Sequence, residues 1–155
     1  MSDTRTISRS PIELLMREHE LLNGLLEAYE DLIPAQIQEK EELGRRIQEE
    51  IFRHVGTEEA LFYPTLMELK DTRIHELIGE VLAEHRELEA LAAELQKAGP
   101  GPKANLIVTM IRPRAAHHMK NEELEVFPFA WGLPRETLNQ MGLEMEERRT
   151  REGYF

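Results

Sequence analysis

The chain has 155 residues, of which 41% are hydrophobic and 32% charged, a composition typical of one globular domain. Thirty acidic and nineteen basic side chains give a formal net charge of −11, which argues against nucleic acid or an anionic membrane as a partner, because phosphate groups attract positive charge. The absence of cysteine excludes disulfides and thiolate metal sites, and with neither a signal peptide nor a membrane-spanning apolar run we expect a cytoplasmic protein.

Residues that favour helices, and signals typical of helix ends, predict an all-α chain. Ser10, Pro11 and Glu13 form a capping box that opens a first helix, which ends before Pro34. The strongest turn in the sequence is expected at residues 99–102, which read Gly-Pro-Gly-Pro. The remaining helices are expected at residues 37–70, 73–97 and 103–131, with a shorter one at 135–149.

Four long helices joined by short loops predict an antiparallel, up-down-up-down four-helix bundle with a short fifth helix at the C-terminal end. We expect residues 1–9 to form a flexible N-terminus, residues 10–131 the bundle, and residues 132–155 the fifth helix and a frayed tail. The arginine-rich end of the fifth helix either packs across the bundle or mediates self-association. A monomer and a homodimer both remain open.

An internal repeat divides the bundle into two similar helical hairpins. Residues 54–64 in the second helix and residues 118–128 in the fourth both read His-x3-Glu-Glu-x4-Pro. In the first and third helices a single histidine follows a glutamate, at His19 and at His85. Each hairpin therefore carries one histidine followed by a His-x3-Glu pair.

Helical geometry places the repeated histidines and glutamates on the apolar face of each helix. Residues four apart lie on one face, so each His-x3-Glu pair points to the same side. A single histidine on such a face is more often a core residue with a hydrogen-bond partner, but the repetition argues against that interpretation. Six ionisable side chains are thus expected in the core: His19, His54, Glu58, His85, His118 and Glu122.

Buried carboxylates need a counter-charge, and no lysine or arginine near the two His-x3-Glu pairs lies clearly on this face. Four imidazoles and two carboxylates suit two metal ions, with each carboxylate able to bridge them. A donor set of nitrogen and oxygen without sulfur favours iron, with manganese and zinc as alternatives.

Other residues are candidates for hydrogen bonds to the ligand histidines, or for the apolar wall of the site. The alternative for the three glutamates is exposure to solvent at the ends of the bundle, and for the histidine a place on the surface or rim. The candidates are Glu50, Glu89, His117, Glu125, Phe62 and Phe129.

Five further residues are expected to lie away from the site. His75 should be at the surface because its direction around the helix differs from that of the ligand histidines. Glu59 and Glu123 should point sideways into solvent, and Tyr63 and Trp131 should lie on the far side from the carboxylates.

This pattern resembles the hemerythrin-like family, also called the HHE cation-binding domain, over about residues 11–131. The resemblance implies an antiparallel four-helix bundle around a non-heme di-iron centre, with two iron ions joined by an oxo or hydroxo bridge. It also implies that Glu58 and Glu122 bridge the irons and that the four histidines are terminal ligands. A ferritin-like site is disfavoured, because that family uses a Glu-x-x-His spacing.

The sequence departs from the oxygen-carrying hemerythrins. Those proteins have an H-x3-H pair on the third helix, whereas the residue four positions after His85 is Glu89. Their last carboxylate belongs to an H-x4-D pair, whereas Glu122 follows in an H-x3-E pair. One nitrogen ligand is therefore missing unless His117 or Glu89 replaces it.

The apolar wall expected around the site, from Met16, Leu61, Phe62 and Phe129, would admit small neutral molecules and exclude bulky ones, which favours oxygen, hydrogen peroxide or nitric oxide as the ligand. With fewer histidines, peroxide or nitric-oxide chemistry becomes more plausible than reversible oxygen carriage. Three functions remain open at this point. The chain is a peroxide-decomposing (catalase-like) or oxidant-reducing enzyme, a carrier or sensor of oxygen or nitric oxide without turnover, or an iron-handling protein.

Overall fold

The computed structural model describes residues 10–152, and the regular secondary structure in this range consists of helices. No β-strand occurs within this range, which confirms the all-α prediction. The predictions for residues 1–9 and for the end of the tail lie outside the described residues. In chain order the elements are α1 (Pro11–Asp31), α2 (Ile37–Thr57), the π-helix η2 (Glu58–Phe62), α3 (Tyr63–Leu66), α4 (Thr72–Ala98), α5 (Pro102–Asn121), the π-helix η3 (Glu122–Val126), α6 (Phe127–Ala130) and α7 (Arg135–Arg151).

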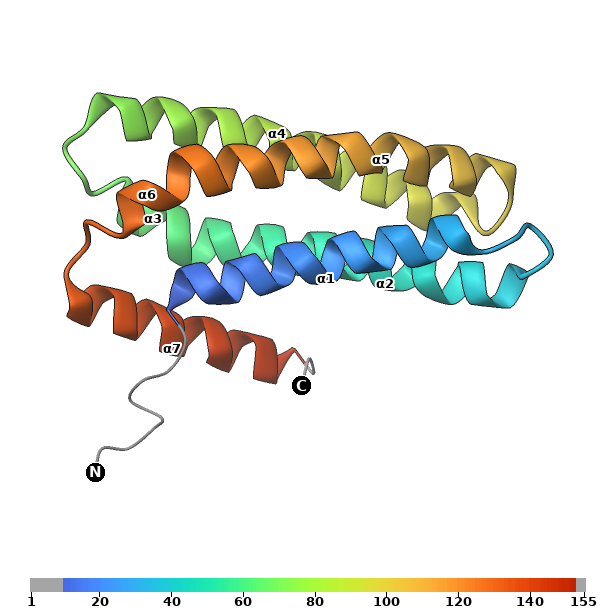
Figure 1. Cartoon of the computed structure of the whole chain (residues 1–155), viewed down its shortest axis with the longest axis horizontal. Helices are drawn as coiled ribbons and strands as arrows, with labels where there is room; N and C mark the ends of the chain where they lie inside the picture. Colours follow the sequence, from blue (N-terminus) through green and yellow to red (C-terminus); the bar gives the residue numbers. More distant parts are fainter. Residues whose placement is uncertain (1–9, 153–155) are drawn as a thin grey trace.

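Four long helical segments form the bundle predicted from the sequence: α1, α2 with η2 and α3, α4, and α5 with η3 and α6 (Figure 1). Capping begins α1, where the Ser10 side chain accepts a hydrogen bond from the Glu13 amide at 3.1 Å. Between α4 and α5, Gly99 and Gly101 have φ angles of 68° and 140°. Glycine adopts this backbone conformation without steric cost, so the predicted turn falls at the predicted place.

Each repeat contains a π-helical turn that the sequence did not predict. The Tyr63 amide donates to the Glu58 carbonyl, and the Phe127 amide donates to the Glu122 carbonyl. A proline follows each turn; it has no N–H, and its ring would collide with the carbonyl four residues earlier in a regular α-helix. The wider turn adds one residue and relieves this conflict. It also brings the residue five positions after the glutamate onto the glutamate's own face.

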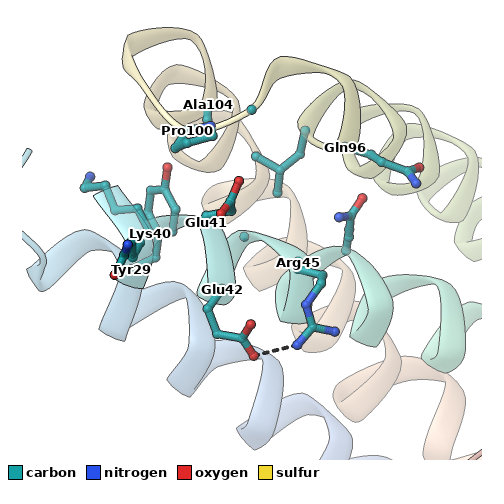
Figure 2. A pocket seen from close by; sticks show the side chains of 13 residues that line it. Tyr29, Lys40, Glu41, Glu42, Arg45, Gln96, Pro100 and Ala104 are labelled. Atoms are coloured by element: carbon teal, nitrogen blue, oxygen red, sulfur yellow. Dashed lines mark hydrogen bonds and ion pairs between the residues drawn. The ribbon is translucent and has the colours of Figure 1, made fainter. Parts of the chain in front are cut away.

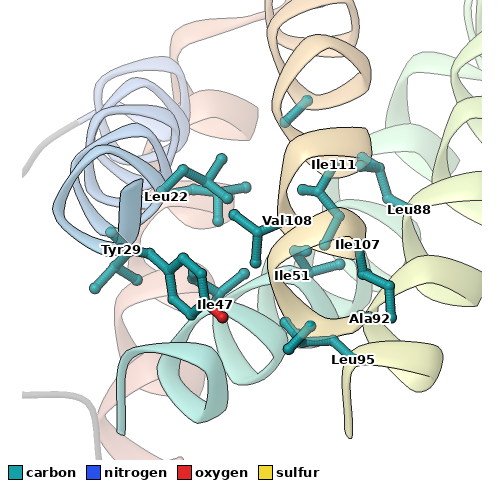
Figure 3. Packing of buried hydrophobic residues seen from close by; sticks show 14 of the residues in the cluster. Leu22, Tyr29, Ile47, Ile51, Leu88, Ala92, Leu95, Ile107, Val108 and Ile111 are labelled. Atoms are coloured by element: carbon teal, nitrogen blue, oxygen red, sulfur yellow. The ribbon is translucent and has the colours of Figure 1, made fainter. Parts of the chain in front are cut away.

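Two apolar clusters fill the bundle, with a polar layer between them. Along α1 this layer contains Glu18 and His19, which lie between Leu15 of one cluster and Leu22 of the other. The cluster near the α1–α2 and α4–α5 loops includes Leu22, Ile47, Ala92 and Ile111 (Figure 3). The other cluster includes Leu15, Phe62, Ile74, Val126 and Met145.

Helix α7 packs against α1 and η2 on the outside of the bundle (Figure 1). Its residues Met141 and Met145 are buried in the second cluster, and its Arg149 side chain is buried as well. The arginine-rich fifth helix therefore packs across the bundle, which was one of the two alternatives. None of the helices described is long and apolar enough to cross a membrane.

A pocket of about 350 Å³ opens at the loop end of the bundle (Figure 2). Two residues that line it, Tyr29 and Lys40, each donate a hydrogen bond of 2.9 Å to Asn105 Oδ1. Lys40 Nζ also lies 4.5 Å from the centre of the Tyr29 ring. Because Tyr29 is ten residues beyond His19 on α1, or roughly 15 Å along the helix, this pocket is separate from the polar layer.

Replacing Leu26 with alanine should lower the free energy of unfolding by about 2–5 kcal/mol, because Leu26 is fully buried in the cluster at the loop end. Urea unfolding measures the change. The matched control is Leu106→Ala, whose side chain is 60% exposed and whose loss should change the free energy by less than about 0.5 kcal/mol. A similar cost for both substitutions would contradict the packing described here.

Candidate metal centre

The structure brings together all six ionisable residues predicted to lie in the core. Their side chains form two groups of four that could each hold a metal ion, with one ligand atom from each residue lying within 4.8 Å of the others. Glu58 and Glu122 belong to both groups. The first half-site consists of these two glutamates with His19 and His54, and the second half-site of the same two glutamates with His85 and His118.

The Nε2 atoms of all four histidines face the shared carboxylates. In the first half-site, His19 Nε2 lies 3.1 Å from Glu122 Oε1 and His54 Nε2 lies 3.2 Å from Glu58 Oε1. In the second, the distances are 2.8 Å from His85 Nε2 to Glu58 Oε1 and 3.2 Å from His118 Nε2 to Glu122 Oε1. Both carboxylate side chains are completely buried.

The Nδ1 atom of every one of these histidines donates to a further glutamate. The donor–acceptor distances are 2.6 Å for His54 and 2.8 Å for the other three. A proton held at Nδ1 leaves the Nε2 lone pair free to point at the centre, which is the form of imidazole that binds a metal. The four pairs are His19–Glu123, His54–Glu18, His85–Glu59 and His118–Glu84.

The expectation that Glu59 and Glu123 point into solvent is therefore wrong. Both side chains are about one-third exposed, but each reaches a histidine of the other hairpin. The sequence carries a signal for them, because the Glu-Glu pair recurs in both repeats. Glu18 and Glu84, which immediately precede His19 and His85, recur in the same way.

The glutamates proposed as partners of the ligand histidines lie elsewhere. Glu89 pairs with Arg86 and Glu125 with Arg73 at the surface. Both predictions are therefore corrected, because these side chains face solvent and an arginine and do not reach a ligand histidine. Glu50 is fully buried, with Oε2 3.6 Å from an arginine of α7.

The remaining candidates divide between the surface and the core. His117 is 73% exposed, and its Nε2 lies 3.2 Å from Glu84 Oε2; it does not enter either half-site. Phe62 is fully buried in the second apolar cluster, and Phe129 packs against that cluster. His75 is at the surface as expected, with Nε2 near the carbonyls at the end of α3.

Tyr63 lies in the site, which corrects its predicted position on the far side. In a regular α-helix it would point roughly 140° away from Glu58, but the π-helical turn aligns the two residues. The Tyr63 hydroxyl lies 2.9 Å from Glu58 Oε1, 2.5 Å from Glu122 Oε2 and 3.1 Å from His85 Nε2. Trp131, by contrast, is 58% exposed, as expected.

The equivalent residue in the second repeat is Phe127, so the two half-sites differ. Its ring stacks on His19 with centroids 5.8 Å apart, as the Tyr63 ring stacks on His85 at 5.3 Å. Phe127 has no hydroxyl, so among residues 10–152 only the second half-site has a phenol beside it.

The charges of the centre shift the pKa values of its groups. Burial lowers the pKa of His54 and His118, but the adjacent carboxylates outweigh it and raise both values well above 6.5. Burial raises the pKa of Glu58 and Glu122, whereas the histidines lower it, to about 2 for Glu122 and well below the ordinary range for Glu58. Burial and the two carboxylates raise the pKa of Tyr63 well above 10.

Several buried atoms of the centre suit a bound cation. His54 Nε2, His118 Nε2 and Glu58 Oε2 are inaccessible to solvent and make no hydrogen bond within residues 10–152. Leaving such atoms without a partner is costly, and all three are potential metal donors. A donor set of imidazole nitrogen and carboxylate oxygen suits a first-row transition metal such as iron.

Comparison with known proteins gives a family match and a similar fold. A family model described as the Hemerythrin HHE cation binding domain matches residues 10–130. A crystal structure of a Hemerythrin HHE cation binding domain-containing protein from Mycobacterium kansasii is similar, with a TM-score of 0.76, 21% identity, and coverage of 94% of this chain and 91% of that chain. No curated protein sequence matches significantly.

Replacing Glu58 with alanine should abolish binding of both metal ions, because this carboxylate belongs to both half-sites. His54→Ala should cost one ion, because His54 belongs only to the first. Elemental analysis of purified protein measures the metal per chain. His75→Ala is the control and should keep the full content; metal loss in that variant, or unchanged metal in both site variants, would contradict the assignment.

Without bound metal, the protein should be less stable at pH 8.5 than at pH 5.5, by more than about 1 kcal/mol. Groups whose pKa is raised on folding, here His19, His54 and His118, stabilise the fold below 6.5, and this stabilisation is lost as pH rises through the raised values. The lowered pKa of Glu122 changes the stability of the fold only as pH falls from 4.5 towards about 2, which is below both pH values compared. Urea unfolding of chelator-treated protein at both pH values tests this, and greater stability at pH 8.5 would contradict it.

Proposed function

Because this chain belongs to the hemerythrin HHE cation-binding family, we propose that it is a non-heme di-iron protein that reacts with small oxidants at a centre buried in the bundle. The family match over residues 10–130 confirms the resemblance drawn from the repeated motifs. The geometry of the polar layer supports the choice of two ions and of a small oxidant as the ligand.

One observation carries the proposal. Two groups of four donors share Glu58 and Glu122, so His19 and His54 would hold one ion, His85 and His118 would hold another, and the two glutamates would contribute to both. In each group the histidines are already oriented by a carboxylate at Nδ1. Such outer partners fix the ring and increase the basicity of the ligand atom.

The burial of the centre supports a small substrate. Glu58, His85 and Glu122 are each 0% exposed, and the apolar rings of Phe62 and Phe127 pack together beside the site at a centroid distance of 5.7 Å. A bulky or highly charged substrate would have to displace this packing. Oxygen, hydrogen peroxide and nitric oxide are small and neutral and can reach the centre through minor fluctuations of the bundle.

The Tyr63 hydroxyl favours reaction over reversible binding. The position left by the missing nitrogen ligand is filled neither by His117 nor by Glu89, and an oxygen donor lies beside the second half-site instead. When an O–O bond breaks, the departing oxygen must receive a proton, and Tyr63 Oη holds one beside Glu58 Oε1 and Glu122 Oε2. The iron pair, when bound, would supply and accept the electrons of this reaction.

The hydroxyl beside the centre therefore favours a peroxide-decomposing enzyme over a reversible carrier. The test uses protein purified without chelators, with iron analysis and optical spectra before and after hydrogen peroxide is added. About two irons per chain and evolution of oxygen are expected. The same iron content with a stable, reversible oxygen adduct would favour a carrier, and the absence of iron would overturn the proposal.

Tyr63→Phe should retain both irons but slow peroxide decomposition by about a hundredfold, because it removes the proton donor and leaves the ring in place. Oxygen evolution measured with an electrode gives the rate. Tyr29→Phe is the control, since Tyr29 lies at the loop end of the bundle, and its rate should match the unmodified protein. An unchanged rate for Tyr63→Phe would remove Tyr63 from the reaction.

A further inference from the structure

The two half-sites have different outer partners despite the internal repeat. In the first, Glu18 accepts from His54 Nδ1 through Oε1 and from Arg149 Nη1 through Oε2. In the second, the equivalent Glu84 accepts from His118 Nδ1 through Oε1 and from Asn121 Nδ2 through Oε2 at 3.2 Å. A buried cation from outside the bundle therefore contacts Glu18, whereas Glu84 Oε2 meets a neutral amide and the 73% exposed His117, whose Nε2 lies 3.2 Å away.

Arg149 is unusual in its burial and its location. Its side chain is only 5% exposed, and Nη1 lies 3.6 Å from Oε2 of the fully buried Glu50. The guanidinium thus sits between carboxylates of α1 and α2. Buried charges of this kind are retained only with partners of opposite sign, and removing one partner leaves the others uncompensated.

The arginine also comes from outside the matched domain. The family model ends at residue 130, whereas Arg149 lies in the last turn of α7. The link between α7 and the centre is a chain of direct contacts that runs from Arg149 to Glu18, to His54 and to Glu58. A segment outside the four helices thereby reaches one half-site and not the other.

We propose that Arg149 is a positioning residue through which α7 controls metal retention in the first half-site. The guanidinium fixes Glu18 and compensates its charge, and Glu18 in turn fixes the His54 ring with Nε2 towards the centre. Loss of the guanidinium leaves Glu18 free to turn away from Nδ1, so His54 is no longer held in its binding orientation. This inference rests on the proposed di-iron function.

The first test is the binding of ferrous ion, added without oxygen to chelator-treated protein. Arg149→Met keeps the length of the side chain but removes the charge, and it should weaken one of the two binding steps about tenfold. Arg149→Lys restores the charge and should recover most of the loss. Arg151→Met makes the same change on an exposed side chain of α7 and should bind iron like the unmodified protein.

The half-site affected is identified by combining Arg149→Met with a ligand substitution. In a His118→Ala background the remaining ion occupies the first half-site, and Arg149→Met should weaken it about tenfold. In a His54→Ala background the remaining ion occupies the second half-site, and Arg149→Met should have no effect. If Arg149 only stabilised the fold, Arg149→Met would weaken ferrous-ion binding equally in both backgrounds.

The outcomes separate this inference from the function on which it rests. Failure of the unmodified protein to bind two ferrous ions overturns the proposed function and the inference together. Two ions in the unmodified protein with unchanged binding in Arg149→Met, or equal losses in both backgrounds, overturn the inference alone. Should Arg149→Met lose its helical circular dichroism, Glu18→Gln replaces it in both backgrounds, and the same pattern of one affected background is expected.

Discussion

Two carboxylates, Glu58 and Glu122, lie fully buried at the centre of the bundle, and the compensation of their charge determines how the rest of the molecule is built. Apolar packing alone cannot offset the cost of removing two carboxylates from water. The structure surrounds them with four imidazoles, each backed by a further carboxylate at Nδ1. These outer groups add negative charge, which metal cations held by the six central side chains would balance.

The internal repeat makes the two half-sites similar, and two departures from the repeat make their surroundings different. Tyr63 places a hydroxyl beside the second half-site where Phe127 places only a ring beside the first. The buried Arg149 contacts Glu18 of the first half-site, whereas Asn121 and the exposed His117 contact the equivalent Glu84 in the second. Two ions held by similar ligands would therefore meet different surroundings, one with a proton donor nearby and the other with a buried cation. This difference suits a reaction in which the two ions have unequal tasks.

The sequence predicted those features that depend on regular helical periodicity. The four helices, the turn at Gly99 and the common location of the six core residues all follow from spacing and helix-end signals. The position of Tyr63 could not be predicted in this way, because a π-helical turn changes the phase by one residue. The contact of Arg149 with Glu18 joins residues 131 apart and depends on how α7 docks, for which no local pattern exists.

In the proposed di-iron centre, Glu58 and Glu122 would each contribute to the ligands of two metal ions in one chain. The most direct measurement is anomalous X-ray diffraction at the iron absorption edge, on crystals of iron-loaded protein. Two anomalous peaks per chain are predicted, one beside His19 and His54 and the other beside His85 and His118, with both carboxylates between them. A single peak, or peaks away from these six side chains, would contradict the proposed di-iron centre.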